Sequence, residues 1–92
     1  MQSTEFEFDP RKSAANLAKH GIDFVAAQEM WMDPSMIEID ARSSDEPRML
    51  VVGAVCGALW SAVVTRRRGS VRIISVRRAR QDERRLYEAE DR

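Results

Sequence analysis

Cysteine and histidine are almost missing from this chain, which has one of each among its 92 residues. A lone cysteine excludes an internal disulfide and is typical of a protein kept in a reducing cytoplasm. Structural zinc sites use four Cys or His ligands, so we expect no metal site of that kind and no cofactor. Cys56 lies in the apolar stretch VVGAVCGALW, and this context predicts a small buried side chain.

Long apolar runs and glycine-rich phosphate loops are also lacking. No stretch approaches the roughly 20 apolar residues that span a bilayer, so we expect no membrane contact. The first ten residues, MQSTEFEFDP, lack the basic and apolar regions of a signal peptide, and a cytoplasmic location is expected. Neither GSV nor GAVCG has the spacing of a phosphate-binding loop. With 43% apolar and 33% charged residues, the chain is expected to fold as a single domain over residues 1–92.

The net charge is zero, but the two signs are unevenly distributed. Residues 1–65 hold five Lys or Arg and ten Asp or Glu, whereas residues 66–85 hold nine Arg and two acids. The C-terminal third therefore carries a strong local positive field. Arginine suits planar, bidentate contacts with phosphate better than lysine does. Two interpretations stay open: solvated charge with ion pairs along a helix, or the binding of a phosphate-bearing partner.

Capping residues predict two helices in the N-terminal half. Asp9 and Pro10 are typical of a helix start, and Gly21 of a left-handed helix end. Asp23 predicts the start of a second helix, which an Asp-Pro pair at residues 33–34 ends. One face of the first helix is formed by Ala14, Leu17 and Ala18.

Alternating and continuous apolar runs predict strands in the second half. Residues 48–56 and 59–65 form a predicted hairpin, and residues 71–77 a third strand. Shorter strands are indicated at residues 6–9 and near residue 37, and a helical pattern continues to about residue 90. The predicted fold class is α+β, with two N-terminal helices, a three- to four-stranded antiparallel sheet and a C-terminal helix.

A few polar residues admit both a structural and a chemical interpretation. His20 lies in the last turn of the first helix, where its imidazole interacts favourably with the helix dipole. An imidazole is also suited to transfer protons or to place a positive charge on a phosphate. Lys19 has the same ambiguity. Glu46 and Arg48 are consistent with an exposed ion pair. Alternatively, Glu46 is a base held near cationic groups. Tyr87 is consistent with core packing or with proton transfer.

Two runs of sequence carry a family resemblance. FEFDPRKSAANLAKHGIDF is similar to the pattern WDxxK…N…KHG(V/I)xF, and VRIISVRRARQDERRLYE is similar to RIISARxAxxxERxxYE. Both patterns belong to the BrnT toxins, a branch of the RelE-like toxins of bacterial toxin–antitoxin pairs. The resemblance covers almost the whole chain in order and implies a RelE-like fold. Three positions depart from it: Phe8 replaces Trp, Pro47 splits an acidic–Arg pair, and Arg67 replaces a frequent acid.

The resemblance implies a toxin that acts as a metal-independent endoribonuclease, cleaves mRNA and inhibits translation. It also implies a cognate antitoxin, BrnA-like, with a ribbon-helix-helix domain that binds DNA. The two proteins are expected to form a heterotetramer, which neutralises the toxin and binds operator DNA through the antitoxin. The alternative is a non-catalytic nucleic-acid-binding or operon-regulating subunit, which the charge alone supports.

Candidate site residues follow from the resemblance together with the chemistry of RNA cleavage. Without a metal, the substrate's 2′-OH is the nucleophile, and the protein must move protons and stabilise the charge on the phosphorane. The predicted catalytic residues are His20, Lys19, Glu46, Arg72 and Arg77, with the two arginines on the scissile phosphate. The predicted RNA phosphate-binding residues are Arg66, Arg78 and Arg48.

Overall fold

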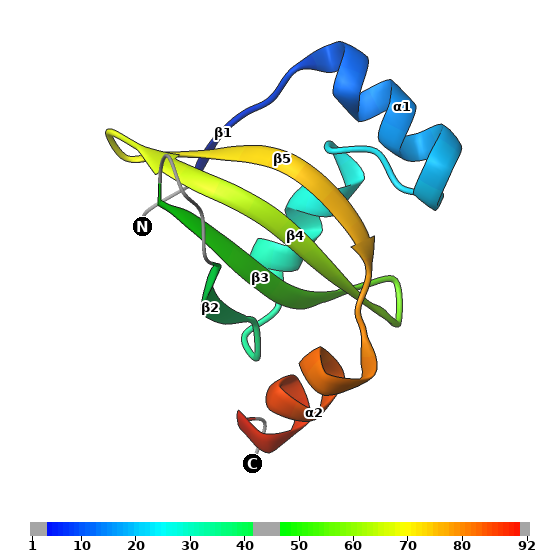
Figure 1. Ribbon diagram of the computed structural model, residues 1–92, viewed down its shortest axis with the longest axis vertical. Helices are drawn as coiled ribbons and strands as arrows, with labels where there is room; N and C mark the ends of the chain where they lie inside the picture. The colour runs from blue at the N-terminus through cyan, green and yellow to red at the C-terminus, as the bar shows by residue number, and fades with distance from the viewer. Residues whose placement is uncertain (1–3, 42–46, 91–92) are drawn as a thin grey trace.

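Strands and helices occupy most of the chain in the computed structural model, which describes residues 4–41 and 47–90 (Figure 1). In chain order the elements are β1 Glu5–Glu7, α1 Pro10–His20, η1 Ala26–Met32, β2 Ile37–Ala41, β3 Arg48–Val55, β4 Ala58–Arg67, β5 Ser70–Arg78 and α2 Gln81–Glu90. Within this described part, no helix combines the length and the apolar character needed to cross a membrane.

The five strands of the described residues form one sheet in the order β1-β5-β4-β3-β2. The pairs β2–β3, β3–β4 and β4–β5 are antiparallel, whereas β1 lies parallel to β5. The predicted three- to four-stranded antiparallel sheet is therefore wrong in strand number and in the direction of one strand, although the α+β character holds. β1 is only three residues long, and its Phe6 pairs with the distant Val71, so no local pattern indicates this pairing.

Two-residue turns join β3 to β4 and β4 to β5, as the glycines predict. Cys56 and Gly57 have φ angles of 50° and 80°, and Arg68 and Gly69 have 48° and 87°. Positive φ at both central residues is the type I′ turn, whose twist matches that of the adjoining strands. Cys56 is exposed at its turn, so the prediction that it is buried is wrong. The apolar residues around it belong to the strands and not to the turn.

The second predicted N-terminal helix is the short 3-10 helix η1, so the prediction of two N-terminal α-helices is also wrong. Asp23 caps this segment, because its Oδ1 accepts the N–H of Ala26 at 2.8 Å. The N–H of Asp33 then bonds the carbonyl of Met30, three residues back, at 3.1 Å. Bonds of this spacing tighten the helix and limit it to a short segment.

α1 begins and ends at the predicted caps, but its inward face is polar. Ser13 and Asn16 are buried, while Leu17 is 50% exposed. The Asn16 side chain bonds the backbone of β5: Nδ2 donates to the carbonyl of Val76 at 2.9 Å, and Oδ1 accepts its N–H at 3.1 Å. Nδ2 also donates to the carbonyl of Ile22 at 2.8 Å. The side-chain amide of Asn16 thus provides the hydrogen-bond partners for the backbone of β5 where β1 no longer pairs with it.

The hydrophobic core lies between the sheet and the two N-terminal helical segments. Close approach of η1 to β3 depends on Gly53, since a Cβ there would lie 3.2 Å from the Met30 Cβ and from its carbonyl oxygen. The buried members of the core are Ile22, Phe24, Ala27, Met30, Val51, Val55, Ala62, Val64, Val71, Ile73 and Val76. We call the opposite side of the sheet the second face.

Candidate nucleic-acid interface

α2 lies over one end of the second face of the sheet. Side chains alternate between the two faces of a strand. Ala62 faces the core, so its neighbour Ser61 faces the other way, and the Ser61 hydroxyl donates to Glu83 of α2 at 2.8 Å. The rest of this face carries several of the predicted arginines.

Three residues lie side by side on the second face, near the turn between β4 and β5. Thr65 of β4 is paired with Arg72 of β5. Met49 is paired with Val64, and continuing this register by one residue sets Arg48 opposite Thr65. Directly opposite residues have Cβ atoms about 4.5–5.5 Å apart. We call Arg48, Thr65 and Arg72 the arginine row.

Polar atoms in the arginine row are incompletely bonded. The Arg48 Nε and the Thr65 Oγ1 are buried and have no hydrogen-bond partner within the described residues. The Arg72 Nη1 lies 3.8 Å from the Oε1 of Glu7, and both side chains are partly exposed, so this ion pair is weak. The row therefore contains two donors without an acceptor and one loosely held guanidinium.

Arg77, at the other end of β5 on the same face, is fully engaged with Glu83. Its Nη1 and Nη2 donate to Oε1 and Oε2 of Glu83, both at 2.8 Å. The same Oε1 accepts the Ser61 hydroxyl and the N–H of Arg80, each at 2.8 Å. The bonds from Arg77 lower the pKa of Glu83 to about 2 against the effect of burial, helped by Arg80 and Ser61. The hydrogen bond with Glu83 raises the pKa of Arg77. The Arg77 guanidinium thus holds α2 to the sheet.

Tyr87 forms a second polar attachment of α2. Its hydroxyl donates to Oδ2 of Asp33 at 2.7 Å, and the same oxygen accepts the N–H of Ala54 at 2.9 Å. The N–H of Ser35 donates to Oδ1 at 2.9 Å. Burial raises the pKa of Asp33, but these three hydrogen bonds outweigh it and leave the pKa lowered. Tyr87 is therefore a donor to a carboxylate that links η1, β3 and α2.

Arg66 and Arg78 lie away from the arginine row. Arg66 is opposite Val71, which faces the core side, and it forms an exposed ion pair with Glu38. Arg78 lies over the ring of Trp60, 5.3 Å from the ring centroid, in a cation–π contact. These two guanidinium groups therefore do not converge with Arg72.

His20 and Lys19 end α1, on the helical side of the sheet. Asn16, one turn earlier in the same helix, is bonded to Val76, which lies four residues beyond Arg72, or about 13 Å along the strand. Within residues 4–41 and 47–90, the side chains of His20 and Lys19 form no hydrogen bond or ion pair. The structure does not bring these two side chains together with Arg72.

Glu46, the remaining predicted catalytic residue, lies outside the described residues. Thr65, in contrast, was missed by sequence reasoning. It is a hydroxyl residue that follows the buried run at the centre of the sheet and precedes three arginines. Among the described residues, no three His, Cys, Asp or Glu side chains form a group that could hold a metal ion.

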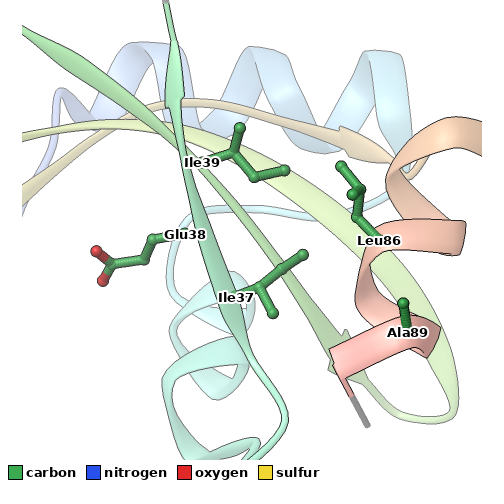
Figure 2. A pocket seen from close by; sticks show the side chains of 5 residues that line it. All are labelled: Ile37, Glu38, Ile39, Leu86 and Ala89. Atoms are coloured by element: carbon green, nitrogen blue, oxygen red, sulfur yellow. The ribbon is translucent and has the colours of Figure 1, made fainter.

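A groove of 380 Å³ separates α2 from β2 at the edge of the second face. Its lining residues are Ile37, Glu38, Ile39, Leu86 and Ala89. Ile37 and Ile39 point toward Leu86, while Glu38 points away from the helix (Figure 2). Leu86 stays 50% exposed, which agrees with a helix attached mainly through its polar contacts.

A pair of partly exposed arginines on one face of a sheet is suited to a phosphodiester backbone, because arginine forms bidentate, charge-assisted bonds with phosphate oxygens. The comparisons with known proteins agree with this chemistry. Residues 8–83 match the family model described as the ribonuclease toxin, BrnT, of type II toxin–antitoxin systems. The match includes the arginine row and most of both motifs that carry the resemblance, and it confirms that resemblance. No curated protein matches the chain.

Proposed function

The chain belongs to the BrnT family of ribonuclease toxins of type II toxin–antitoxin systems, and on that premise we propose that it is a metal-independent endoribonuclease. Membership of this family gives it RNA as a target and a protein antitoxin as a partner. In our proposal the RNA is mRNA, and its cleavage inhibits translation. The arginine row supports this proposal most directly, since it places two arginines on either side of Thr65 on the second face of the sheet.

The proposed reaction uses the substrate's own 2′-OH. Its oxygen attacks the adjacent phosphorus, the bond from phosphorus to the 5′ oxygen breaks, and a 2′,3′-cyclic phosphate and a 5′-OH remain. One proton leaves the 2′-OH and one is delivered to the departing 5′ oxygen. DNA has no 2′-OH and is not cleaved by this route. The protein contributes by holding the phosphate and by stabilising the negative charge that develops on it.

Arg72 is assigned to the scissile phosphate, and Arg48 is assigned to RNA phosphate binding beside it. Arg72 can exchange Glu7 for a phosphate at little cost, because exposed ion pairs contribute about 0–1 kcal/mol. Arg77 has a different part in the proposal, since both of its terminal nitrogens face Glu83. Arg77 positions α2 beside the bound RNA.

The other predicted residues also have parts in the proposal. Glu46 is proposed as the proton-transfer group, because it precedes Arg48 by two positions in the chain. His20 is the alternative proton-transfer group. Outer phosphates of a longer RNA are assigned to Lys19, Arg66 and Arg78, because positive charge at the protein surface strengthens binding to a polyanion.

An assay with labelled RNA and the matching DNA in excess EDTA tests the proposal. We expect the purified chain, freed of its partner, to cut RNA, leave a cyclic phosphate end and spare DNA. Arg72→Ala and Arg77→Ala should lower the rate, whereas Arg11→Ala, which removes one charge from the exposed start of α1, should not. Absence of cleavage both with free RNA and with translating ribosomes would refute the proposed endoribonuclease activity. Binding without cleavage would support the nucleic-acid-binding subunit instead.

The proposed partner is a BrnA-like antitoxin with a ribbon-helix-helix domain. The proposal includes a heterotetramer, bound to operator DNA through the antitoxin, in which an acidic segment covers the arginine row. Co-expression followed by light scattering on the purified complex measures its mass. A mass that does not fit two copies of each chain would contradict the heterotetramer.

A further inference from the structure

The Thr65 hydroxyl is an unexplained feature of the arginine row. Thr65 is 3% exposed, and its Oγ1 is buried with no hydrogen-bond partner among the described residues. Most buried polar groups in proteins are hydrogen-bonded, so each exception needs a physical explanation. Valine has the same shape, the same branching and a better fit to an apolar strand. The fold alone therefore does not require a hydroxyl at this position.

A second unpartnered donor lies next to the first. The Nε of Arg48, the residue opposite Thr65 on β3, is also buried without a partner in the described part of the chain. Arg72 flanks Thr65 on the other side, and its ion pair among the described residues is the 3.8 Å contact with Glu7. Arg48 and Arg72 are thus two strand spacings apart, about 9.5 Å, with Thr65 at the midpoint. All three side chains offer donors, and the carboxylate that the described residues place beside them is Glu7, 3.8 Å from the Arg72 Nη1.

We propose that Thr65 is a phosphate ligand, so that one phosphate of the RNA binds between Arg48 and Arg72 and accepts a hydrogen bond from the Thr65 hydroxyl. The Nε of Arg48 donates to the same phosphate, and Arg72 turns to it from Glu7. The phosphate thus accepts hydrogen bonds from both donors that lack a partner among the described residues, the Arg48 Nε and the Thr65 hydroxyl. This inference rests on the proposed function and names the substrate group that the arginine row binds.

Binding of an uncleavable RNA tests the inference separately from catalysis. The probe is a fluorescent 2′-O-methyl RNA oligonucleotide, which has no 2′-OH to attack, followed by anisotropy over a range of salt concentrations. We expect Thr65→Val to weaken binding on the order of tenfold to a hundredfold, because a hydrogen bond to a charged group is lost. Thr65→Ser keeps the hydroxyl and should bind within about threefold of the wild type. Ser75→Ala, which removes an exposed hydroxyl elsewhere on β5, is the matched control.

Two further measurements separate this role from a structural one. Thr65→Val should melt at the same temperature as the wild type or higher, because it removes a buried polar atom that has no partner in the free protein. Its salt dependence should match that of the wild type, because a neutral hydroxyl releases no counterion. Arg72→Gln should instead reduce the slope of log affinity against log salt by about 0.7, the value for one single-strand phosphate contact.

Each outcome supports or overturns the inference. Weaker binding of the RNA by Thr65→Val with unchanged stability supports the role of Thr65 as a phosphate ligand. This holds even if no form of the protein cleaves RNA, a result that would contradict the proposed ribonuclease activity but not the role of Thr65. Equal binding of the RNA by Thr65→Val and the wild type overturns the proposed phosphate contact of Thr65. The proposed ribonuclease activity is then still supported if the wild type cleaves RNA. Failure of the wild type to bind the 2′-O-methyl probe at all overturns the proposed phosphate contact as well.

Discussion

Glu83→Gln is the substitution that most sharply tests how α2 is held. Glu83 is buried, and its two oxygens accept four hydrogen bonds, two of them from Arg77. The ordinary pKa of 4.5 falls to about 2 in the folded protein. A difference of that size corresponds to about 3 kcal/mol of stability at neutral pH. Glutamine keeps the shape, but it loses the charge and turns one acceptor into a donor facing Arg77.

The pH dependence of this contribution has a definite sign. The folded-state pKa of Glu83 lies below the unfolded value, so the stabilisation is fully present above about pH 4.5 and is lost as the pH falls toward 2. At pH 3 less than half of it should remain. The difference in stability between wild type and Glu83→Gln should therefore shrink across this window and be constant from pH 6 to pH 8.

Urea unfolding and thermal melting measure both effects. A loss of about 3 kcal/mol should lower the melting temperature by about 12–24 °C in a domain of this size. Glu88→Gln, an exposed position of the same helix, is the control and should shift the melting temperature by little. A loss of less than about 1 kcal/mol at pH 7, or one that stays constant down to pH 3, would refute the reasoning.

Two further predictions concern the other polar attachments. Asn16→Asp should destabilise the fold by about 2–4 kcal/mol at pH 7 in urea unfolding, because a carboxylate would face two carbonyl oxygens in a buried site; an unchanged midpoint would contradict this role for Asn16. Tyr87→Phe should cost about 1.5–3 kcal/mol, because it removes the donor to the Asp33 carboxylate. Hydrogen exchange should then show faster opening of α2 with little change in the central strands. An equal change in protection of α2 and of the central strands would contradict the role of Tyr87 in attaching α2.

Local signals predicted local structure well. The caps at Asp9 and Gly21 and the hairpin of β3 and β4 depend on residues within a few positions of one another, and these predictions are confirmed. β1 was harder, because its three residues are stabilised by a partner strand and by packing against Trp31, both distant in the sequence. The apolar residues of α1 were misleading as well: Leu17 faces solvent, and the helix is attached through Ser13 and Asn16.

The candidate site was predictable in composition and not in arrangement. The surplus of arginine over residues 66–85 indicated an anionic partner, but which guanidinium groups already have a carboxylate depends on register and on the docking of α2. Glu83 lies six residues after Arg77, across the junction of a strand and a helix, so no helical spacing rule links them. Thr65 gave no signal by residue type, because a buried threonine in a strand is ordinary. Only its missing partner distinguishes it.

Loss of activity in Arg77→Ala has two explanations that a single variant does not separate. The substitution removes a guanidinium from the second face, and it also leaves Glu83 buried without its partner, which costs about 3–5 kcal/mol in typical proteins. The double variant Arg77→Leu/Glu83→Gln removes both charges and should recover most of the stability lost in the single variant. If Arg77 acts only by holding α2, RNA cleavage should recover together with the melting temperature. A double variant that is as stable as the wild type and still inactive would show instead that Arg77 contacts the substrate, because restored folding without restored cleavage leaves only the missing guanidinium to account for the loss.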